Sequence, residues 1–235
     1  MKRFYKEVSV TAVESGWQVM LDTRAMKTVG GLAQILPTKV LAEALAAEWS
    51  AQGEKIDPAS MPLRDMADYA IDMVSPDTDA LIEKAVAYGD TDTLLYRADP
   101  DEPLFARQQE VWEPVVGALE ARLGVQFVRI SGIIHRPQHD ETLVKLRDEL
   151  TGQSPFALAA IEAMTHLAAS LITGLSASEP KADALALWNA ANLEEDWQIE
   201  QWGRDEEAEE RREKRTGDFL RARQFWELTH SQTGN

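Results

Sequence analysis

Apolar and polar residues alternate at the start of the chain, with the period of two that half-buried β-strands show. Val8, Val10 and Ala12 alternate with polar neighbours, and a second alternation runs through residues 17–21. Between the two runs, residues 14–16 read Glu-Ser-Gly, which is typical of a hairpin turn. The pattern therefore predicts two neighbouring strands joined by a short turn.

The pattern then changes from strands to helices. A second turn is predicted at residues 22–24, and a Gly-Gly pair follows before a short apolar run over residues 32–36. We interpret this run as a third strand of the same small sheet. Thr38 comes directly after it and suits the N-cap of a helix, because its hydroxyl can accept a hydrogen bond from a first-turn amide.

Apolar residues at helical spacing dominate the rest of the chain. Gly124 and Gly174 are placed to end two of these helices, whereas Ser154 and Ser178 are placed to begin two others. The segment 155–173 is apolar on most faces, which predicts a central buried helix. The expected helices cover residues 38–52, 62–74, 78–88, 103–123, 155–173, 180–215 and 217–229.

One segment interrupts the helical pattern. Val125–Ile134 is rich in β-branched residues, and we interpret it as a strand or hairpin that either joins the N-terminal sheet or stands alone. The expected fold class is α+β. A small β-rich α/β N-terminal domain is expected over residues 1–58, followed by an all-α orthogonal helical bundle over residues 59–235. The boundary between them could lie as late as residue 75.

Composition narrows the classes of function. The 235 residues carry 40 acidic against 24 basic side chains, a formal net charge of −16. Such a surface repels nucleic-acid phosphates and anionic lipid headgroups, so we expect neither as a partner. The chain has no cysteine and no apolar stretch long enough to span a membrane. Its N-terminus lacks a signal core, so we expect a bacterial cytoplasmic protein, or a processed form in the mitochondrial matrix.

Motifs that support catalysis are sparse. The chain has no Walker A loop, no Gly-x-Gly-x-x-Gly after a strand and no Gly-x-Ser-x-Gly elbow. Glu162 and His166 lie four residues apart on the predicted buried helix, and with Glu195 they are the candidates for an enzyme of the helical domain. A satisfied polar stripe inside a bundle is the simpler explanation of Glu162 and His166, and we favour it. We therefore expect no enzyme, no metal site and no cofactor. The alternative is a helical-domain enzyme that uses Glu162, His166 and Glu195.

The most unusual segment is the acidic stretch 193–208, which contains two tryptophans and a glycine. If it belongs to one long helix, one stripe of that helix should mostly face the bundle. The stripe consists of Leu185, Trp188, Asn192, Glu195, Ile199, Trp202 and Glu206.

Two acidic positions on this stripe stand where apolar residues are expected. Glu195 and Glu206 therefore need partners, either an arginine of this chain or a basic residue of another protein. Gly203 weakens the middle of such a helix, or lets a partner's backbone approach closely. The simpler alternative is a charged, solvated helix whose tryptophans anchor it in its own core. The cations that would then match the C-terminal dipole of this helix are Arg211, Arg212, Lys214 and Arg215.

A series of short motifs runs through almost the whole chain. They are Leu21-Asp22-Thr23-Arg24-Ala25-Met26-Lys27-Thr28, Glu48-Trp49 with Gln52, Ile56-Asp57-Pro58, Met61-Pro62-Leu63, Ala67 with Ala70-Ile71-Asp72, Tyr88, Thr91-Asp92-Thr93-Leu94-Leu95-Tyr96-Arg97, Gln109 with Trp112 and Pro114, and Glu194-Glu195 with Gln198, Trp202-Gly203, Asp205 and Glu207-Ala208. In this order and spacing they resemble the family of F1-ATPase assembly chaperones that act on the alpha subunit.

The resemblance has four departures, and it carries definite implications. The family usually has glycine at position 23, proline at 25 and 29, and threonine at 64, where this chain has Thr23, Ala25, Val29 and Arg64. These departures concern local loop conformation. The resemblance implies a small α/β domain followed by a helical domain. It also implies binding of the unassembled alpha subunit, shielding of its beta-contacting surface, and neither a cofactor nor a reaction.

The resemblance and the misplaced carboxylates together suggest where a client would bind. We hypothesise that the client-binding site, or a structural site allied to it, contains Glu194, Glu195, Gln198, Trp202, Asp205 and Glu207. The loop from Asp92 to Arg97 is a second possible surface, although we expect its charged residues to form structural ion pairs with nearby chain. We expect a monomer, because no heptad seam extends beyond one helix.

Overall fold

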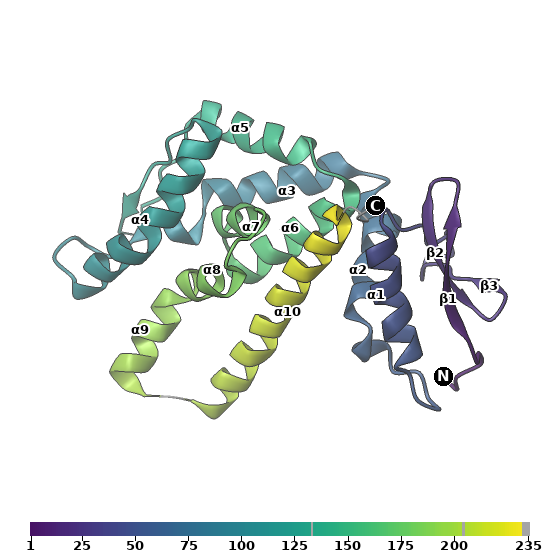
Figure 1. The fold of residues 1–235 in the computed structure, drawn as a ribbon. Coiled ribbons are helices and arrows are strands. Elements are labelled where there is room, and N and C mark those ends of the chain that lie inside the picture. Colours follow the sequence, from purple (N-terminus) through teal and green to yellow (C-terminus); the bar gives the residue numbers. More distant parts are fainter. Residues whose placement is uncertain (133, 204, 232–235) are drawn as a thin grey trace. The chain divides into compact units, whose positions relative to one another are not determined.

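The computed structural model describes residues 1–132, 134–203 and 205–231 (Figure 1). The chain forms two units. The first contains residues 1–78 together with 154–160 and 224–235, and the second contains residues 79–153 and 161–223. A small sheet lies at the N-terminus and helices follow it, so the expected α+β class is confirmed. The expected domain boundary near residue 58 stays a prediction.

The sheet of the first unit is built from a hairpin and a very short third strand. Strand β1 (Val8–Val13) pairs antiparallel with β2 (Gly16–Leu21), and β2 pairs with β3 (Arg24–Ala25). The predicted hairpin is thereby confirmed. The third strand was expected over residues 32–36, and this was wrong. That run is held by isolated bridges instead, since Leu36 exchanges backbone hydrogen bonds of 2.8 and 2.9 Å with Trp17.

The helices of the first unit begin where the sequence indicates. Helix α1 (Lys39–Ser50) starts after Thr38, whose hydroxyl accepts a hydrogen bond from the Leu41 amide at 3.1 Å. It packs on β1 and β2 with its apolar face. A 3₁₀ turn η1 (Pro58–Ser60), helix α2 (Pro62–Tyr69) and a π-helical turn η2 (Ala70–Val74) complete this stretch.

Two segments from far along the chain complete the first unit. The rings of Phe156 and Phe225 stack with centroids 6.2 Å apart. The Thr38 hydroxyl also donates a hydrogen bond of 2.6 Å to the Leu228 carbonyl, 190 residues away. The first unit is therefore closed by residues that lie near the C-terminus of the chain.

The second unit is helical around a core that contains two buried tryptophans. Trp112 donates its indole N–H to the Ala190 carbonyl at 2.7 Å, and the rings of Trp188 and Phe219 lie 5.1 Å apart. None of the helices in the described ranges combines the length and apolar character needed to cross a membrane. The helices, of which α3, α6 and α10 have residues in the first unit, are α3 (Thr78–Asp90), η3 (Thr93–Leu95), α4 (Pro103–Leu123), α5 (Asp140–Thr151), α6 (Pro155–Ala168), α7 (Leu171–Ala177), α8 (Ala184–Ala191), α9 (Leu193–Trp202) and α10 (Glu206–His230).

The predicted β segment at 125–134 is only partly present. Ile130–Ser131 (β5) pairs in parallel with Tyr96–Arg97 (β4), so this segment neither joins the N-terminal sheet nor forms its own hairpin. The preceding amides bond to side chains instead of a strand, because Phe127 N–H donates to Glu120 and Val128 N–H donates to Gln138, both at 2.7 Å. Ile133, also in the predicted segment, lies outside the described residues.

The predicted buried helix over 155–173 is two helices. The chain breaks after α6 at Ala169, whose φ of 49° is left-handed, and Ser170 caps α7 by accepting a hydrogen bond of 2.9 Å from the Thr173 amide. Gly174 was expected to end the helix, but it lies inside α7. A Cβ at Gly174 would overlap the Thr165 hydroxyl of α6, so glycine here permits close packing of the two helices.

The predicted long helix over 180–215 is also wrong. Asp183, not Ser178, caps α8, since its carboxylate accepts a hydrogen bond from the Ala186 amide at 2.9 Å. The chain then forms α8 and α9 and turns before α10. The separate helix expected over 217–229 is the second half of α10, which runs without interruption from Glu206 to His230.

Candidate functional site

The chain reverses direction between α9 and α10, and this turn creates the candidate site (Figure 1). Gly203 ends α9 with a φ of 90°, a conformation that glycine adopts without strain. Asp205 then caps α10 by accepting a hydrogen bond of 2.9 Å from the Ala208 amide. Gly203 was expected in the middle of a helix, and the structure corrects this: it is the residue that lets two helices face each other.

A groove of about 920 Å³ lies between α9 and the first half of α10. Its apolar lining comes from Ile199, Trp202 and Ala208, and charged side chains of both signs surround these residues. Both walls come from the second unit. We call this feature the α9–α10 groove.

Ion pairs link the two walls of the α9–α10 groove. Arg212 holds both carboxylate oxygens of Asp196, at 2.6 and 2.9 Å. Glu195 lies 3.7 Å from Arg212 and 3.4 Å from Arg215. These arginines were expected to match a helix C-terminus, but they lie in the interior of α10. The partners that Glu195 needs therefore include arginines of its own chain.

The ion pairs of Glu195 with Arg212 and Arg215 contribute little to stability. The Glu195 side chain is 52% exposed, so water and salt screen its attraction to both arginines. Exposed ion pairs of this kind typically contribute about 0.2–1 kcal/mol. The prediction that Glu195 is semi-buried was therefore wrong, because it assumed one continuous helix.

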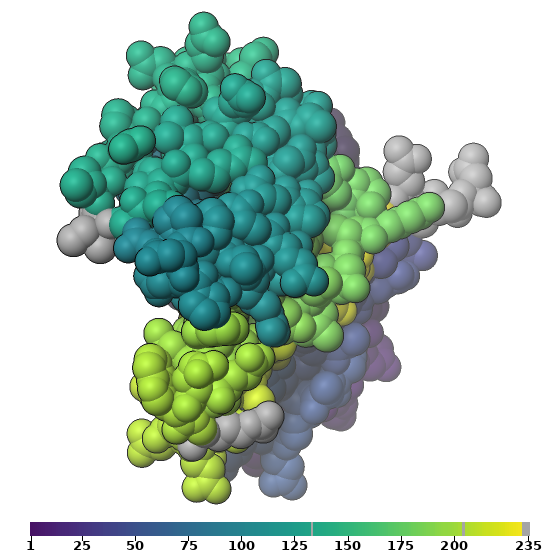
Figure 2. Space-filling view, turned by 90° about the vertical axis from the view of Figure 1, so that its left-hand side faces the viewer, coloured from purple at the N-terminus to yellow at the C-terminus, as the bar shows by residue number. Residues whose placement is uncertain are grey.

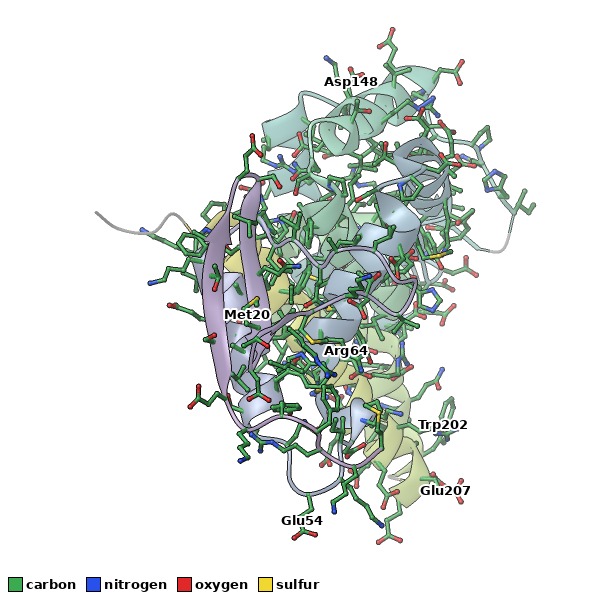
Figure 3. The ribbon with its side chains drawn as sticks, turned by 90° about the vertical axis from the view of Figure 1, so that its right-hand side faces the viewer. Met20, Glu54, Arg64, Asp148, Trp202 and Glu207 are labelled. Carbon is green, nitrogen blue, oxygen red and sulfur yellow. The ribbon has the colours of Figure 1, made fainter. Side chains whose placement is uncertain are left out.

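Trp202 is the most unusual residue of the groove. Its side chain is 79% exposed, although the predicted helical stripe placed it toward the bundle. Figure 3 shows Trp202 and Glu207 projecting from the same end of the helical region. Tryptophan is enriched among the residues that carry most of the binding energy at protein interfaces, so an exposed tryptophan at a groove is a candidate contact residue.

Four of the six hypothesised site residues line the α9–α10 groove, namely Glu195, Gln198, Trp202 and Asp205. The other two lie elsewhere. Glu194 points away to α4, where it accepts a hydrogen bond of 2.7 Å from the Gln108 side chain, and burial raises the pKa of its carboxyl. Glu207 is exposed in the first turn of α10.

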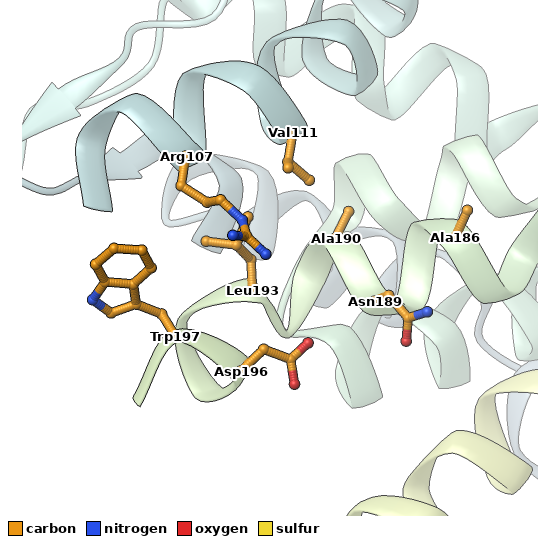
Figure 4. Close-up of a pocket in the computed structure, with 8 residues that line it drawn as sticks. All are labelled: Arg107, Val111, Ala186, Asn189, Ala190, Leu193, Asp196 and Trp197. Atoms are coloured by element: carbon orange, nitrogen blue, oxygen red, sulfur yellow. The ribbon is translucent and has the colours of Figure 1, made fainter. Parts of the chain in front are cut away.

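A smaller pocket of about 330 Å³ lies on the other side of α9 (Figure 4). Figure 2 shows α9 in yellow-green next to the blue surface of α4. The pocket's walls come from α4, α8 and α9, and its residues are Arg107, Val111, Ala186, Asn189, Ala190, Leu193, Asp196 and Trp197. This pocket has no local signal in the sequence, since it forms only where the three helices meet.

The residues of the alternative enzyme do not form one site. Glu162 pairs with Lys84 of α3 at 2.6 Å, and the His166 Nδ1 lies 3.0 Å from the Tyr88 hydroxyl of the same helix. The closest cations of Glu195 are the arginines of α10. Within residues 1–132, 134–203 and 205–231, no three His, Asp or Glu side chains are grouped so that they could hold a metal ion.

The loop from Asp92 to Arg97 has a structural role. Arg97 is buried and pairs with Glu113 at 2.8 Å, so the expected ion pair is confirmed for this residue. Among the described residues, Asp92 is held by backbone amides and not by the ion pair that was expected for it. Its carboxylate accepts hydrogen bonds from the amides of Leu94 at 3.0 Å and Ile172 at 2.8 Å. It joins η3 to the start of α7.

Comparison with solved structures shows close relatives over the whole length. Atp12 from Paracoccus denitrificans is 39% identical with a TM-score of 0.93, and the match covers 97% of this chain and 98% of that one. The Atu1473 protein from Agrobacterium tumefaciens is 38% identical with a TM-score of 0.92, covering 97% and 85% of the two chains.

Comparison by sequence gives the same family. The mitochondrial protein atp12 of Schizosaccharomyces pombe is 26% identical over 221 residues, which cover 89% of this chain and 76% of the yeast protein. The mitochondrial protein ATP12 of Saccharomyces cerevisiae is also 26% identical, covering 88% and 77%. A family model described as ATP12 chaperone protein matches residues 2–120. The chain therefore belongs to the ATP12 chaperone family, the F1-ATPase assembly chaperones that its motifs resemble.

Proposed function

We propose that this protein binds the unassembled alpha subunit of F1 ATP synthase and shields its beta-contacting surface until assembly. We place the client contact at the α9–α10 groove. The observation that carries this proposal is Trp202, which is 79% exposed above a groove lined by charges of both signs. Family membership supports the chaperone role, and the groove supplies a surface suited to it.

The groove combines the two properties that a holding chaperone needs. Trp202 and Ile199 offer aromatic and apolar area, which supplies most of the binding energy at protein interfaces. The exposed pairs of Glu195 with Arg212 and Arg215 are weak enough to exchange for charges on a client, so they favour encounter and orientation over permanent binding. A client held in this way can still be released when a better partner arrives.

We also propose that the protein acts by binding alone, without catalysis or a cofactor, and that it is a monomer. It works in the bacterial cytoplasm, or in the mitochondrial matrix as a processed form. Both yeast relatives are named as mitochondrial proteins, which supports the second setting for a eukaryotic member.

Replacement of Trp202 tests the aromatic part of the proposal. Trp202→Ala should weaken binding of the isolated alpha subunit by a factor of about 30 or more, as loss of an interface hot spot does. The measurement is light scattering of the alpha subunit diluted from denaturant, with and without equimolar protein. The matched control is Val144→Ala on α5, which is 53% exposed and lies outside the groove. Equal protection by both variants would contradict a client contact at Trp202.

A charge reversal tests the electrostatic part. Glu195→Lys places a third cation beside Arg212 and Arg215, and it should abolish client protection while the variant stays folded, because the lost ion pairs are exposed. Glu210→Lys is the control, since Glu210 is exposed on α10 and does not line the groove. Circular dichroism confirms folding of both. Full protection by a folded Glu195→Lys variant would place the client site elsewhere.

A further inference from the structure

Strand β1 forms one edge of the sheet in the first unit. The strand order is β1-β2-β3, and among residues 1–132, 134–203 and 205–231 the only strand paired with β1 is β2. Helix α1 packs against the same two strands from one face. The second edge of β1 is therefore an unpaired row of backbone groups.

The register of the hairpin shows which backbone groups face this edge. Val10 lies opposite Val19, and Ala12 lies opposite Trp17. The Val19 carbonyl bonds to Met26 at 2.9 Å, and Trp17 exchanges its backbone bonds with Leu36, so both residues direct their groups away from β1.

The residue pairs whose backbone groups bond β1 to β2 are therefore Ser9–Met20, Thr11–Gln18 and Val13–Gly16. Asp22 N–H donates to the Glu7 carbonyl at 2.9 Å, which follows the same alternation at the start of the strand. Hydrogen bonds to β2 thus come from residues 9, 11 and 13 of β1. The N–H and C=O groups of Val8, Val10 and Ala12 point outward.

This edge lacks the features that usually protect an exposed strand. Its six residues read Val-Ser-Val-Thr-Ala-Val, without a charged residue or a proline. The register with β2 has no bulge over all six pairs. Protein edge strands normally carry lysine, proline or a bulge, because an open edge invites another strand. The side chains on its solvent face, Ser9 and Thr11, are small and exposed.

We propose that the free edge of β1 binds an extended segment of the client, which adds an antiparallel or parallel strand beside Val8, Val10 and Ala12. This inference rests on the proposed function. Only another extended backbone matches a row of outward N–H and C=O groups at strand spacing. A second copy of this chain fits less well, since each copy carries a formal net charge of −16 and the two would repel. The client is thus held at two places, the groove and the strand edge.

Hydrogen exchange of individual amides gives the direct test. In the free protein, the outward amides of Val8, Val10 and Ala12 should exchange fast. In the complex with the isolated alpha subunit, their exchange should slow at least tenfold. The amides of Ser9 and Thr11 serve as internal controls, because β2 protects them in both states.

The outcomes separate this inference from the proposed function. A complex that forms without slowed exchange at these three amides overturns the inference and leaves the groove proposal intact. Absence of any complex overturns both. Slowed exchange in the free protein that grows with its concentration would show pairing between two copies, and this result also overturns the inference.

Two substitutions test the edge without removing the hairpin. Val10→Pro deletes one outward donor and leaves the hydrogen bonds to β2 in place, so client affinity should fall about tenfold. Should that variant unfold, Thr11→Lys places a charge over the edge on the solvent face and should have the same effect. Its matched control is Gln18→Lys, which puts the same charge on the cross-strand partner in β2 and should change affinity less than twofold. Equal affinities of the two lysine variants would overturn the inference.

Discussion

At the scale of single residues, Asp92 is a buried carboxylate that connects two elements of the second unit. It is fully buried, and its carboxylate accepts the amides of Leu94 and Ile172. Burial outweighs these hydrogen bonds and raises the pKa of Asp92 from 3.8 to about 6. The residue that joins η3 to α7 therefore changes its charge close to neutral pH.

This raised pKa gives a pH-dependent stability with a definite sign. A carboxyl that binds its proton more tightly when folded adds stability at low pH, and this stability is lost as the pH rises from about 4 through 6. Asp92→Asn lacks the titration. Its cost in unfolding free energy should be about 1 kcal/mol larger at pH 5.5 than at pH 7.5, as measured by urea denaturation.

An exposed aspartate supplies the comparison for this measurement. Asp148→Asn on α5 changes the same functional group at an exposed position (Figure 3), so it is the matched control measured at both pH values. Equal costs of Asp92→Asn at the two pH values would show that the buried carboxyl keeps an ordinary pKa.

Residue positions at the groove show what sequence reasoning could reach. The motif resemblance singled out six residues, and four of them lie around one groove. Burial was predicted wrongly for Glu195 and Trp202, because it depended on helical phase carried across Asn192, where α8 ends and α9 begins. Arg212 and Arg215 were assigned to a helix end because that helix was expected to stop near residue 215, whereas α10 continues to His230. Whether these residues bind a client stays a prediction.

At the scale of elements, the contact between α6 and α7 depends on Gly174. A Cβ there would overlap the Thr165 hydroxyl and come within 3.2 Å of the Ile161 carbonyl. Gly174→Ala should therefore destabilise the protein by about 1–3 kcal/mol, measured as a lower midpoint of thermal or urea unfolding.

At a second helical glycine, substitution by alanine should have the opposite effect on the free energy of unfolding. Gly117 lies inside α4, and beyond its own helical backbone no atom of the described residues comes within 4 Å of the place that a methyl group would take. Gly117→Ala should therefore stabilise the protein by about 0.5–1 kcal/mol. If Gly174→Ala stabilised the protein to the same degree, close packing of α6 on α7 would not be the reason for glycine at this position.

The elements that were predicted well have local signals in the sequence. The alternation of β1 and β2, the cap at Thr38 and the left-handed Gly124 after α4 each need only neighbouring residues. The helix breaks that were not predicted have no such local signal in the sequence. Ala169 adopts a left-handed φ of 49° although alanine gives no sign of it, because the packing of α6 and α7 imposes the turn. Helical spacing simply continues across such a break.

At the scale of the whole molecule, charge should govern how fast a client arrives. A formal net charge of −16 attracts a basic surface over a distance that salt shortens, from about 14 Å at 50 mM to about 4 Å at 500 mM. On the proposed function, the association rate constant with the alpha subunit should fall about tenfold across this range, measured by stopped-flow fluorescence. The dissociation rate should change less, because apolar contacts at Trp202 are not screened. An association rate independent of salt would contradict this electrostatic steering.

The closure of the first unit by distant segments also bears on how the protein is made. Residues 1–78 are complete early in translation, yet the ring of Phe225 and the carbonyl of Leu228 join their unit only after about 150 further residues have been made. Multidomain chains usually fold from the N-terminus during synthesis. Here the N-terminal unit finishes late, so a premature stop codon before residue 225 would damage the first unit as well as remove the segment that follows the stop.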